Sequence, residues 1–371
     1  MNTHKAMKLP FGFLAVARIS MSSPAVLTAA RPLQIIWEQT AQEGGTFSVD
    51  FSPDGQKLAS GGAYIVQSGA QLYYAENKVW TAHDGTLLAA TPRDQSLGAT
   101  NEITFSPTGQ TVATANGAVY CYPDGGCGAV APGVADYSIP QLNRLDITET
   151  FPINATIDYS PDGTLLATGE YYADYRIQIR NATDLSIIRT LPGHIAAPND
   201  FGTFTVRFSP DRTLLASGGV DSTVKIWRVF DGALIQTLSI GDEFSPNVFT
   251  VSFSPDGQFV AAGTDALCRI KVWRVSDWTL FRSFSFGSEV FGYGQSNLAW
   301  TPDSVYLMGG RTVYPTPLAV RFWNVTTGEL AGEFTDHTGR AIYSIALAPD
   351  GRRFAYAASD DVVVARTPRL R

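Results

Sequence analysis

Cysteine, histidine and charge are all scarce in this sequence of 371 residues, and each scarcity excludes a class of protein. Three cysteines are too few for a disulfide framework. The four histidines show no metal-ligand spacing with one another or with a cysteine. Charged residues make up 16% of the chain, and the net charge is −7 without a basic stripe. We therefore expect no metal, no cofactor and no nucleic-acid partner.

Long apolar runs and catalytic motifs are also missing. The sequence contains no uninterrupted apolar run of membrane-spanning length, so we expect no membrane span. Neither a Gly-x-Ser-x-Gly elbow nor a glycine-rich phosphate loop before a helix is present. We therefore expect no catalytic residues and predict that the protein is not an enzyme.

A short phrase recurs seven times: an aromatic or aliphatic residue, a spacer, proline and, in most copies, aspartate and glycine. Successive prolines are separated by 54, 54, 49, 45, 47 and 47 residues. Such a period, sustained over the whole chain, indicates repeated supersecondary units that share a continuous core. The aspartates of the phrase each belong to a separate turn, which argues against paired acid–base chemistry. The prolines are Pro53, Pro107, Pro161, Pro210, Pro255, Pro302 and Pro349.

The unit from Phe204 to Leu238 shows what one repeat encodes. Residues 204–208 alternate apolar and polar side chains, which is typical of a strand with one buried face. A Ser-Pro-Asp turn at Pro210 leads to a second strand, and an Asp-Gly pair at 231–232 joins a third strand to a fourth. Four antiparallel strands make one propeller blade. We predict an all-β, seven-bladed β-propeller of four-stranded antiparallel blades.

The two ends of the chain indicate how the ring closes. The last repeat encodes three strands, whereas an extra strand-like segment, 33–38, precedes the first repeat. We predict that this N-terminal segment completes the last blade as its outer strand and hides a sheet edge. Residues 33–368 then form one propeller domain, and residues 1–32 form a leader that is disordered or weakly signal-like.

Two features bear on the cellular compartment and leave it open. Lys5 and Lys8 precede the apolar stretch 9–17, as in a signal peptide, but that stretch is short and contains proline. Cys121 and Cys127 flank a turn centred on Asp124, so a hairpin there would face them across neighbouring strands. They are either two free thiols or a disulfide, which requires an oxidising compartment. We favour a cytoplasmic protein, with an extracytoplasmic one as the alternative.

A further signature is a tryptophan followed seven positions later by leucine, as in Trp227 and Leu234. With the turn phrase, this signature makes residues 33–367 resemble the WD-repeat β-propeller family. In that family a histidine, a serine or threonine, an aspartate and the tryptophan form a structural hydrogen-bond network. The resemblance implies this network in the fourth unit, at His194, Ser217, Asp221 and Trp227.

Other units depart from the family pattern. The seventh keeps His337 and Asp360 but has Tyr356 and Arg366 where serine and tryptophan would lie. The second unit lacks the tryptophan, and the third has Arg180 in its place. We therefore expect some blades to be held mainly by apolar packing.

Insertions gather at one end of the predicted blades. The proline turns and the hairpins between third and fourth strands share one end, which we call the short-turn face. The connections between second and third strands and the crossovers between blades share the other end, the long-loop face. Most insertions, including 62–77, 170–175 and the predicted crossover 130–152, fall on the long-loop face.

These connections are rich in aromatic residues, whose apolar area and polar tips suit protein interfaces. The alternative is that they pack only against their own loops. Tyr137 is among them, in the predicted crossover. We predict that the following residues bind a partner: Tyr64, Tyr73, Tyr74, Tyr171, Tyr172, Tyr175, Phe201, Phe291 and Tyr293.

Two functional hypotheses follow. The first is a non-catalytic scaffold that binds a protein or peptide on the long-loop face, as a monomer or as part of a hetero-complex. The family resemblance implies such scaffolding. The second is an extracytoplasmic propeller with a small-ligand or enzymatic site in its central channel. It predicts cleavage of the N-terminus and a bond between Cys121 and Cys127.

Overall fold

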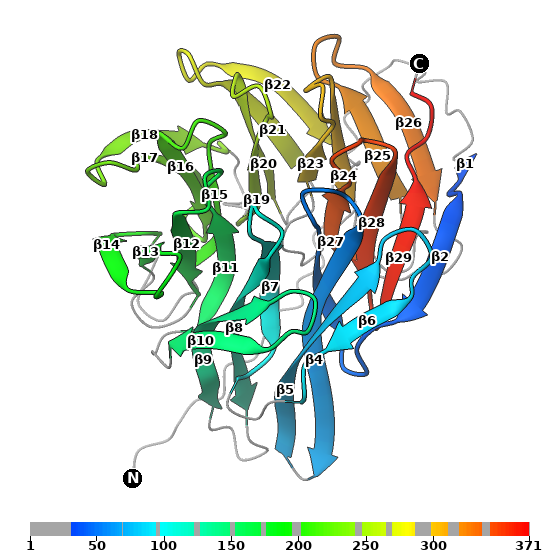
Figure 1. Cartoon of the computed structure of the whole chain (residues 1–371). Helices are drawn as coiled ribbons and strands as arrows, with labels where there is room; N and C mark the ends of the chain where they lie inside the picture. Colours follow the sequence, from blue (N-terminus) through cyan, green and yellow to red (C-terminus); the bar gives the residue numbers. More distant parts are fainter. Residues whose placement is uncertain are drawn as a thin grey trace, which may run out of the picture.

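Seven sheets, each with four antiparallel strands, form blades around a central channel in the part of the chain that the structure describes (Figure 1). Every regular element there is a β-strand, and no helix that could cross a membrane is found among these residues. The predicted all-β, seven-bladed propeller is confirmed. The computed structural model describes residues 31–68, 70–93, 97–121, 127–148, 153–171, 176–194, 202–241, 247–264, 269–285, 298–310, 319–335 and 342–370.

The first four blades each use four strands that follow one another in the chain. Blade 1 has β3 (Thr46–Phe51), β4 (Lys57–Ser68), β5 (Ala70–Thr81) and β6 (Leu87–Ala90). Blade 2 has β7 (Thr100–Phe105), β8 (Thr111–Cys121), β9 (Cys127–Ser138) and β10 (Arg144–Thr148). Blade 3 has β11 (Asn154–Tyr159), β12 (Leu165–Glu170), β13 (Ile177–Asn181) and β14 (Ile187–Leu191). Blade 4 has β15 (Thr203–Phe208), β16 (Leu214–Gly219), β17 (Thr223–Arg228) and β18 (Leu234–Ser239).

The last blades bring the two ends of the chain into the fold. Blade 5 has β19 (Val248–Phe253), β20 (Phe259–Thr264), β21 (Arg269–Arg274) and β22 (Leu280–Ser285). Blade 6 has β23 (Leu298–Trp300), β24 (Tyr306–Gly310), β25 (Ala319–Asn324) and β26 (Leu330–Thr335), with β1 (Arg31–Pro32) added in parallel to β26. Blade 7 has β27 (Ile342–Leu347), β28 (Arg353–Ala358), β29 (Asp361–Arg366) and, from the N-terminal end, β2 (Ile35–Thr40).

Ring closure follows the predicted course. The blue β2 lies beside the red β29 in Figure 1, and the two pair antiparallel from Ile35 opposite Ala365 to Thr40 opposite Asp361. Trp37 of β2 anchors this strand on blade 1, because its indole N–H donates to the carbonyl of Ala82 over 3.2 Å. The predicted N-terminal outer strand of the last blade is confirmed. Residues 31 and 32, assigned to the leader from the sequence, lie in β1.

The hydrophobic core lies between neighbouring blades. In one cluster, Val224 and Ile226 of blade 4 pack with Val251 and Val260 of blade 5, and all four are at most 1% exposed. The fourth strands face solvent, as the mainly exposed pattern of β18 shows. Burial thus decreases from the inner strands to the rim, and each blade depends on its neighbours for stability.

The recurring phrase is explained by one turn. Ser209 accepts a hydrogen bond from the N–H of Leu214 at 2.9 Å and donates to Asp211, whose carboxylate accepts from the N–H of Thr213 at 3.0 Å. The residue after the aspartate has a positive φ, 66° at Gly55, which glycine adopts without strain. Arg212 adopts the same conformation, with a φ of 65°, where its copy of the phrase lacks the glycine.

Two expectations about loops are wrong. Residues 62–77 are not an irregular insertion, because β4 and β5 pair without interruption as far as Ser68 opposite Ala70. Aromatic and β-branched residues on both sides favour this extension. The stretch 130–152 is not only a crossover, since it contains most of β9 and all of β10. Tyr137 accordingly lies in β9 and is 3% exposed.

Blade 2 also carries a long hairpin, of β8 and β9. Its backbone places Cys121 directly opposite Cys127, as the spacing of the two residues predicts. The β4–β5 and β8–β9 hairpins are the longest among the described strands, and both extend at the long-loop face (Figure 1).

Candidate functional site

A belt of side chains links the inner strands around the central channel. In five of the seven blades, a side chain of the inner strand accepts a hydrogen bond from a backbone N–H of the next blade. Ser344 accepts from Val49 at 3.2 Å, and Ser48 accepts from Ile103 at 3.2 Å. The same contact recurs further round the ring, where Thr156 accepts from Val206 at 3.2 Å and Thr205 accepts from Val251 at 3.3 Å. The belt therefore fixes the spacing of successive blades.

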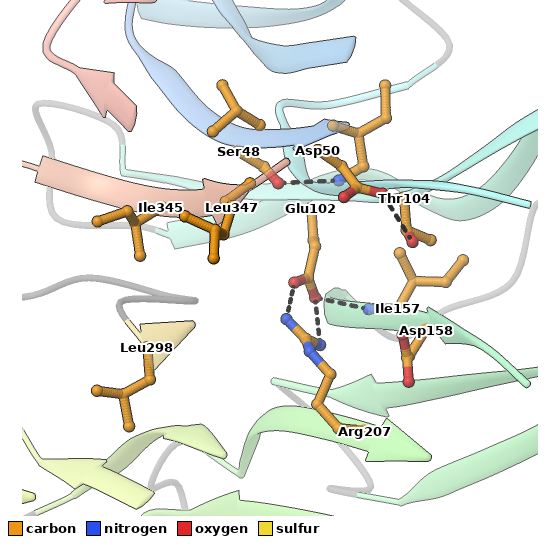
Figure 2. A pocket seen from close by; sticks show the side chains of 13 residues that line it. Ser48, Asp50, Glu102, Thr104, Ile157, Asp158, Arg207, Leu298, Ile345 and Leu347 are labelled. Atoms are coloured by element: carbon orange, nitrogen blue, oxygen red, sulfur yellow. Dashed lines mark hydrogen bonds and ion pairs between the residues drawn. The ribbon is translucent and has the colours of Figure 1, made fainter. Parts of the chain in front are cut away.

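Glu102 occupies the corresponding place in blade 2. Its carboxylate accepts from the N–H of Ile157 at 2.9 Å and from the hydroxyl of Thr156 at 2.6 Å. Arg207, from blade 4, forms an ion pair with Glu102 across the channel (Figure 2). The guanidinium also donates to the carbonyl of Val206 at 2.7 Å. This charge-assisted pair connects three blades, with Glu102 buried and Arg207 half-buried.

Two further carboxylates line the channel. Asp50 accepts from the N–H of Phe105 and Asp158 from the N–H of Phe208, both at 2.7 Å. Burial raises the pKa of Asp50 to about 6, despite its hydrogen bonds to Phe105 and Thr104. Burial likewise raises the pKa of Asp158 to about 7, although Arg207 opposes the shift. Each carboxylate therefore links two blades and resists ionisation.

The cavity enclosed by these groups has a volume of about 180 Å³. Blades 1 to 4 supply its polar side, and Leu298, Ile345 and Leu347 lie on the other side (Figure 2). Among the described residues, no group of three or more histidine, cysteine, aspartate or glutamate side chains could hold a metal ion. The carboxylates that line the channel accept hydrogen bonds from backbone N–H groups of neighbouring blades.

The four residues of the fourth-unit network meet in blade 4. His194, 0% exposed, contacts Asp221 at 2.7 Å through Nδ1 and Ser217 at 2.8 Å through Nε2. The indole of Trp227 donates to the hydroxyl of Ser217 at 2.9 Å. Burial lowers the pKa of His194, despite the hydrogen bond to Asp221. A neutral imidazole therefore joins the crossover segment to the second and third strands.

Blade 1 builds a similar network from a residue that sequence reasoning missed. Gln42 donates to the hydroxyl of Ser60 at 3.2 Å and accepts from Thr46 at 2.7 Å. Trp80 donates to the same serine at 3.0 Å, as Trp227 does to Ser217. The only signal for Gln42 in the sequence is its position. It precedes the first strand of blade 1, as His194 precedes the first strand of blade 4.

The tryptophan position is filled differently in three blades. Strand register places Tyr137 of blade 2 and Arg180 of blade 3 at this position. Arg180 is 2% exposed and donates to the carbonyl of Leu185 at 2.8 Å. In blade 7 the register places Ala365 there, so the expectation for Arg366 is wrong by one residue. Tyr356 does lie at the serine position, opposite Ile345.

The predicted partner-binding residues are only partly described. Tyr64 and Tyr74 face each other across the β4–β5 hairpin, with ring centroids 6.4 Å apart, and the guanidinium of Arg93 lies 3.3 Å from the Tyr64 centroid. Tyr171 packs edge-on against the buried Phe204, at 5.4 Å between centroids. Tyr73 lies in β5, but its side chain is outside the described part. Also outside the described residues are Tyr172, Tyr175, Phe201, Phe291, Tyr293 and His337.

Comparison with known proteins agrees with the blades. The family described as "WD domain, G-beta repeat" matches residues 34–64, 185–228, 232–274 and 328–364. An uncharacterised WD repeat-containing protein of Synechocystis is 34% identical over 144 residues, which cover 37% of this chain and 38% of that protein. Protein HIR1 of Kluyveromyces lactis is 24% identical over 195 residues, covering 46% of this chain and 22% of the relative.

Protein groucho of Drosophila melanogaster is 25% identical over 122 residues, which cover 33% of this chain and 15% of groucho. The chain thus spans less than two fifths of the length of each of these relatives. Each matched segment runs from the fourth strand of one blade into the first strands of the next. In its four matched segments and its seven blades, the chain is similar to the WD-repeat β-propeller family.

Proposed function

We propose that this protein is a non-catalytic interaction scaffold that binds a protein or peptide on the long-loop face. The two long hairpins, β4–β5 and β8–β9, are the observation that carries the proposal. A rigid ring with two projecting hairpins presents an extended surface to a partner, and this surface loses little conformational entropy on binding. Similarity to the WD-repeat family supports the same function as an analogy of fold.

The described aromatic residues indicate where binding is centred. Tyr64, Tyr74 and Arg93 combine apolar area with hydrogen-bonding and cationic groups, the composition typical of interface hot spots. Tyr171 is a weaker candidate, because its ring packs on Phe204 and thus contributes to the fold. The contributions of Tyr73, Tyr172, Tyr175, Phe201, Phe291 and Tyr293 stay predictions.

Site-specific photo-cross-linking in the native host tests the assigned face. A benzophenone-bearing residue at position 64 or 74 should yield cross-links to a partner protein. The same group at position 230 is the control, since Phe230 is 86% exposed in a hairpin of the short-turn face. Cross-links that form only from position 230, or from none of the three, would contradict the proposal.

A matched pair of variants separates binding from folding. Replacing both Tyr64 and Tyr74 by alanine should weaken partner recovery at least tenfold with little change in melting temperature. Replacing Tyr171 by alanine should instead lower the melting temperature, since it removes a ring packed against Phe204. Unchanged recovery with the first variant would remove the β4–β5 hairpin from the interface.

A further inference from the structure

Blade 7 lacks the hairpin that joins third and fourth strands in the other blades. Its third strand, β29, ends at Arg366, and its fourth strand, β2, begins at Ile35 near the other end of the chain. A cleft of about 510 Å³ lies at this open junction. Leu33, Phe334 and Pro368 give it apolar walls, and two arginines, Arg366 and Arg369, line it as well.

Arg366 has equivalents in blades 4 and 5. Strand register pairs Arg228, Arg274 and Arg366 with the first residue of the preceding strand in each blade. The backbone agrees, because the N–H of Arg228 donates to Ala233 at 2.8 Å and the N–H of Arg366 donates to Gln34 at 2.9 Å. Gln34 therefore takes the place of Ala233 as the acceptor. In blade 7, however, no hairpin joins this residue to the arginine.

In blade 4 the hairpin itself supplies a carboxylate to this arginine. Asp231 accepts from Nε of Arg228 at 2.9 Å and from Nη2 at 2.6 Å. The same carboxylate accepts from the N–H of Ala233 at 3.1 Å. Blade 5 has Asp277 three residues after Arg274, but there the guanidinium lies over the Phe281 ring and the aspartate accepts from the N–H of Thr279. Arginine at this position is thus accompanied by an aspartate wherever the hairpin is intact.

Blade 7 keeps the arginine but has no hairpin aspartate. Arg366 and Arg369 are exposed, and neither forms an ion pair with any described residue. The hydroxyl of Thr367, which also lines the cleft, is buried and has no hydrogen-bond partner among these residues. The junction therefore presents cationic donors beside apolar walls on a chain whose net charge is −7.

We propose that the open junction of blade 7 binds an acidic segment of a partner protein, whose carboxylate takes the place of the missing hairpin aspartate. Arg366 offers the same planar fork that Arg228 offers to Asp231, and Arg369 adds a second cation. An apolar side chain next to the acidic residue would pack against Phe334 and Pro368. This second docking site is independent of the long-loop face.

Charge argues against the leader of this chain as the occupant. Residues 1–30 contain Lys5, Lys8 and Arg18 but no aspartate or glutamate. A cationic leader would be repelled by Arg366 and Arg369. A separate acidic partner is therefore the occupant that fits the cleft.

Fluorescence anisotropy with a labelled peptide tests this site on the full chain. The probe is a 12-residue peptide of alternating glutamate and leucine, and its control has glutamine for every glutamate. We expect the acidic peptide to bind at least tenfold more tightly than the amide peptide. Arg366→Gln and Arg369→Gln should each raise its Kd about tenfold, and 0.5 M salt should weaken binding.

Arg274→Gln is the matched control, because it removes the same charge at the same position of a blade whose hairpin is intact. It should change the Kd less than twofold. Equal loss with Arg274→Gln, equal affinity for the two peptides, or no binding would overturn the proposal. Tighter binding by a chain without residues 1–25 would assign the cleft to the leader instead. Melting curves confirm that each variant is folded.

Discussion

At the scale of single residues, one hydroxyl joins three parts of blade 4. Ser217 accepts from Trp227 and contacts His194, so its side chain connects the crossover segment, the second strand and the third strand. The equivalent hydroxyl of blade 3, on Thr168, is buried without a hydrogen-bond partner among the described residues. The hydroxyls at these two equivalent positions thus contribute differently to the stability of their blades.

Ser217→Ala should lower the free energy of unfolding by about 2 kcal/mol, because it leaves the buried Trp227 and His194 nitrogens without their acceptor or donor. Thr168→Val is the control, and it should change stability by less than about 0.5 kcal/mol, since it removes a hydroxyl that is already unpaired. Chemical denaturation of both variants measures the difference. Equal costs would show that the blade 4 network contributes no more than packing.

Residue identities also explain which parts of the site the sequence could predict. Members of the blade 4 network were predictable because each is the residue type that the family uses. Gln42 and Arg180 were not predictable as members of such networks, because their residue types differ from the histidine and tryptophan that blade 4 has at the same positions. Asp50, Asp158 and Arg207 alternate with apolar residues, so they read as the solvent face of a strand. In a closed ring that face lines a narrow channel instead, which one strand considered alone does not reveal.

At the scale of elements, the strand β2 holds the ring closed. It pairs with β29 along most of its length, and Trp37 packs beside Trp80 with centroids 6.2 Å apart. Seven proline turns predicted the number of blades, and the lone segment near Ile35 predicted the closure. The long β4–β5 hairpin was not predicted, because pairing across 62–77 depends on the register between two strands and not on either strand alone.

Trp37→Ala should lower the free energy of unfolding by about 3 kcal/mol, since it empties a buried site between blades 7 and 1. Deletion of residues 33–40 should cost more, because it also exposes the edge of β29. Removal of residues 1–25 should change stability little. Thermal and denaturant unfolding compare the three proteins, and equal effects of the two deletions would contradict the role assigned to β2.

At the scale of the whole molecule, two half-buried channel carboxylates make stability depend on pH. Asp50 and Asp158 have pKa values of about 6 and about 7 in the folded chain, against an ordinary value of 3.8. Between pH values of about 4 and about 7, these two carboxyl groups hold more protons in the folded chain than in the unfolded chain. Their contribution to the free energy of unfolding therefore falls as pH rises from about 4 to about 7, and it is constant above that range.

Asp158→Asn should raise the free energy of unfolding at pH 8 by about 1–2 kcal/mol and flatten its decline between pH 4 and 7. The amide oxygen can still accept from the N–H of Phe208. Asp162→Asn is the control, because that carboxylate is exposed and its hydrogen bonds to Ser160 and Thr164 keep its pKa below the ordinary value. Unchanged pH dependence with Asp158→Asn would show that this carboxylate is ionised at little cost.

The pairing of β2 with β29 also sets an order of events during synthesis. A ribosome makes β2 before the strands of blade 1 and makes β29 only after the four antiparallel strands of blade 6. Until β29 has been made, β2 has no strand to join, and the nascent blades stay an open arc. Premature termination upstream of β29 should therefore yield a product with two exposed sheet edges, which aggregation or proteolysis would remove.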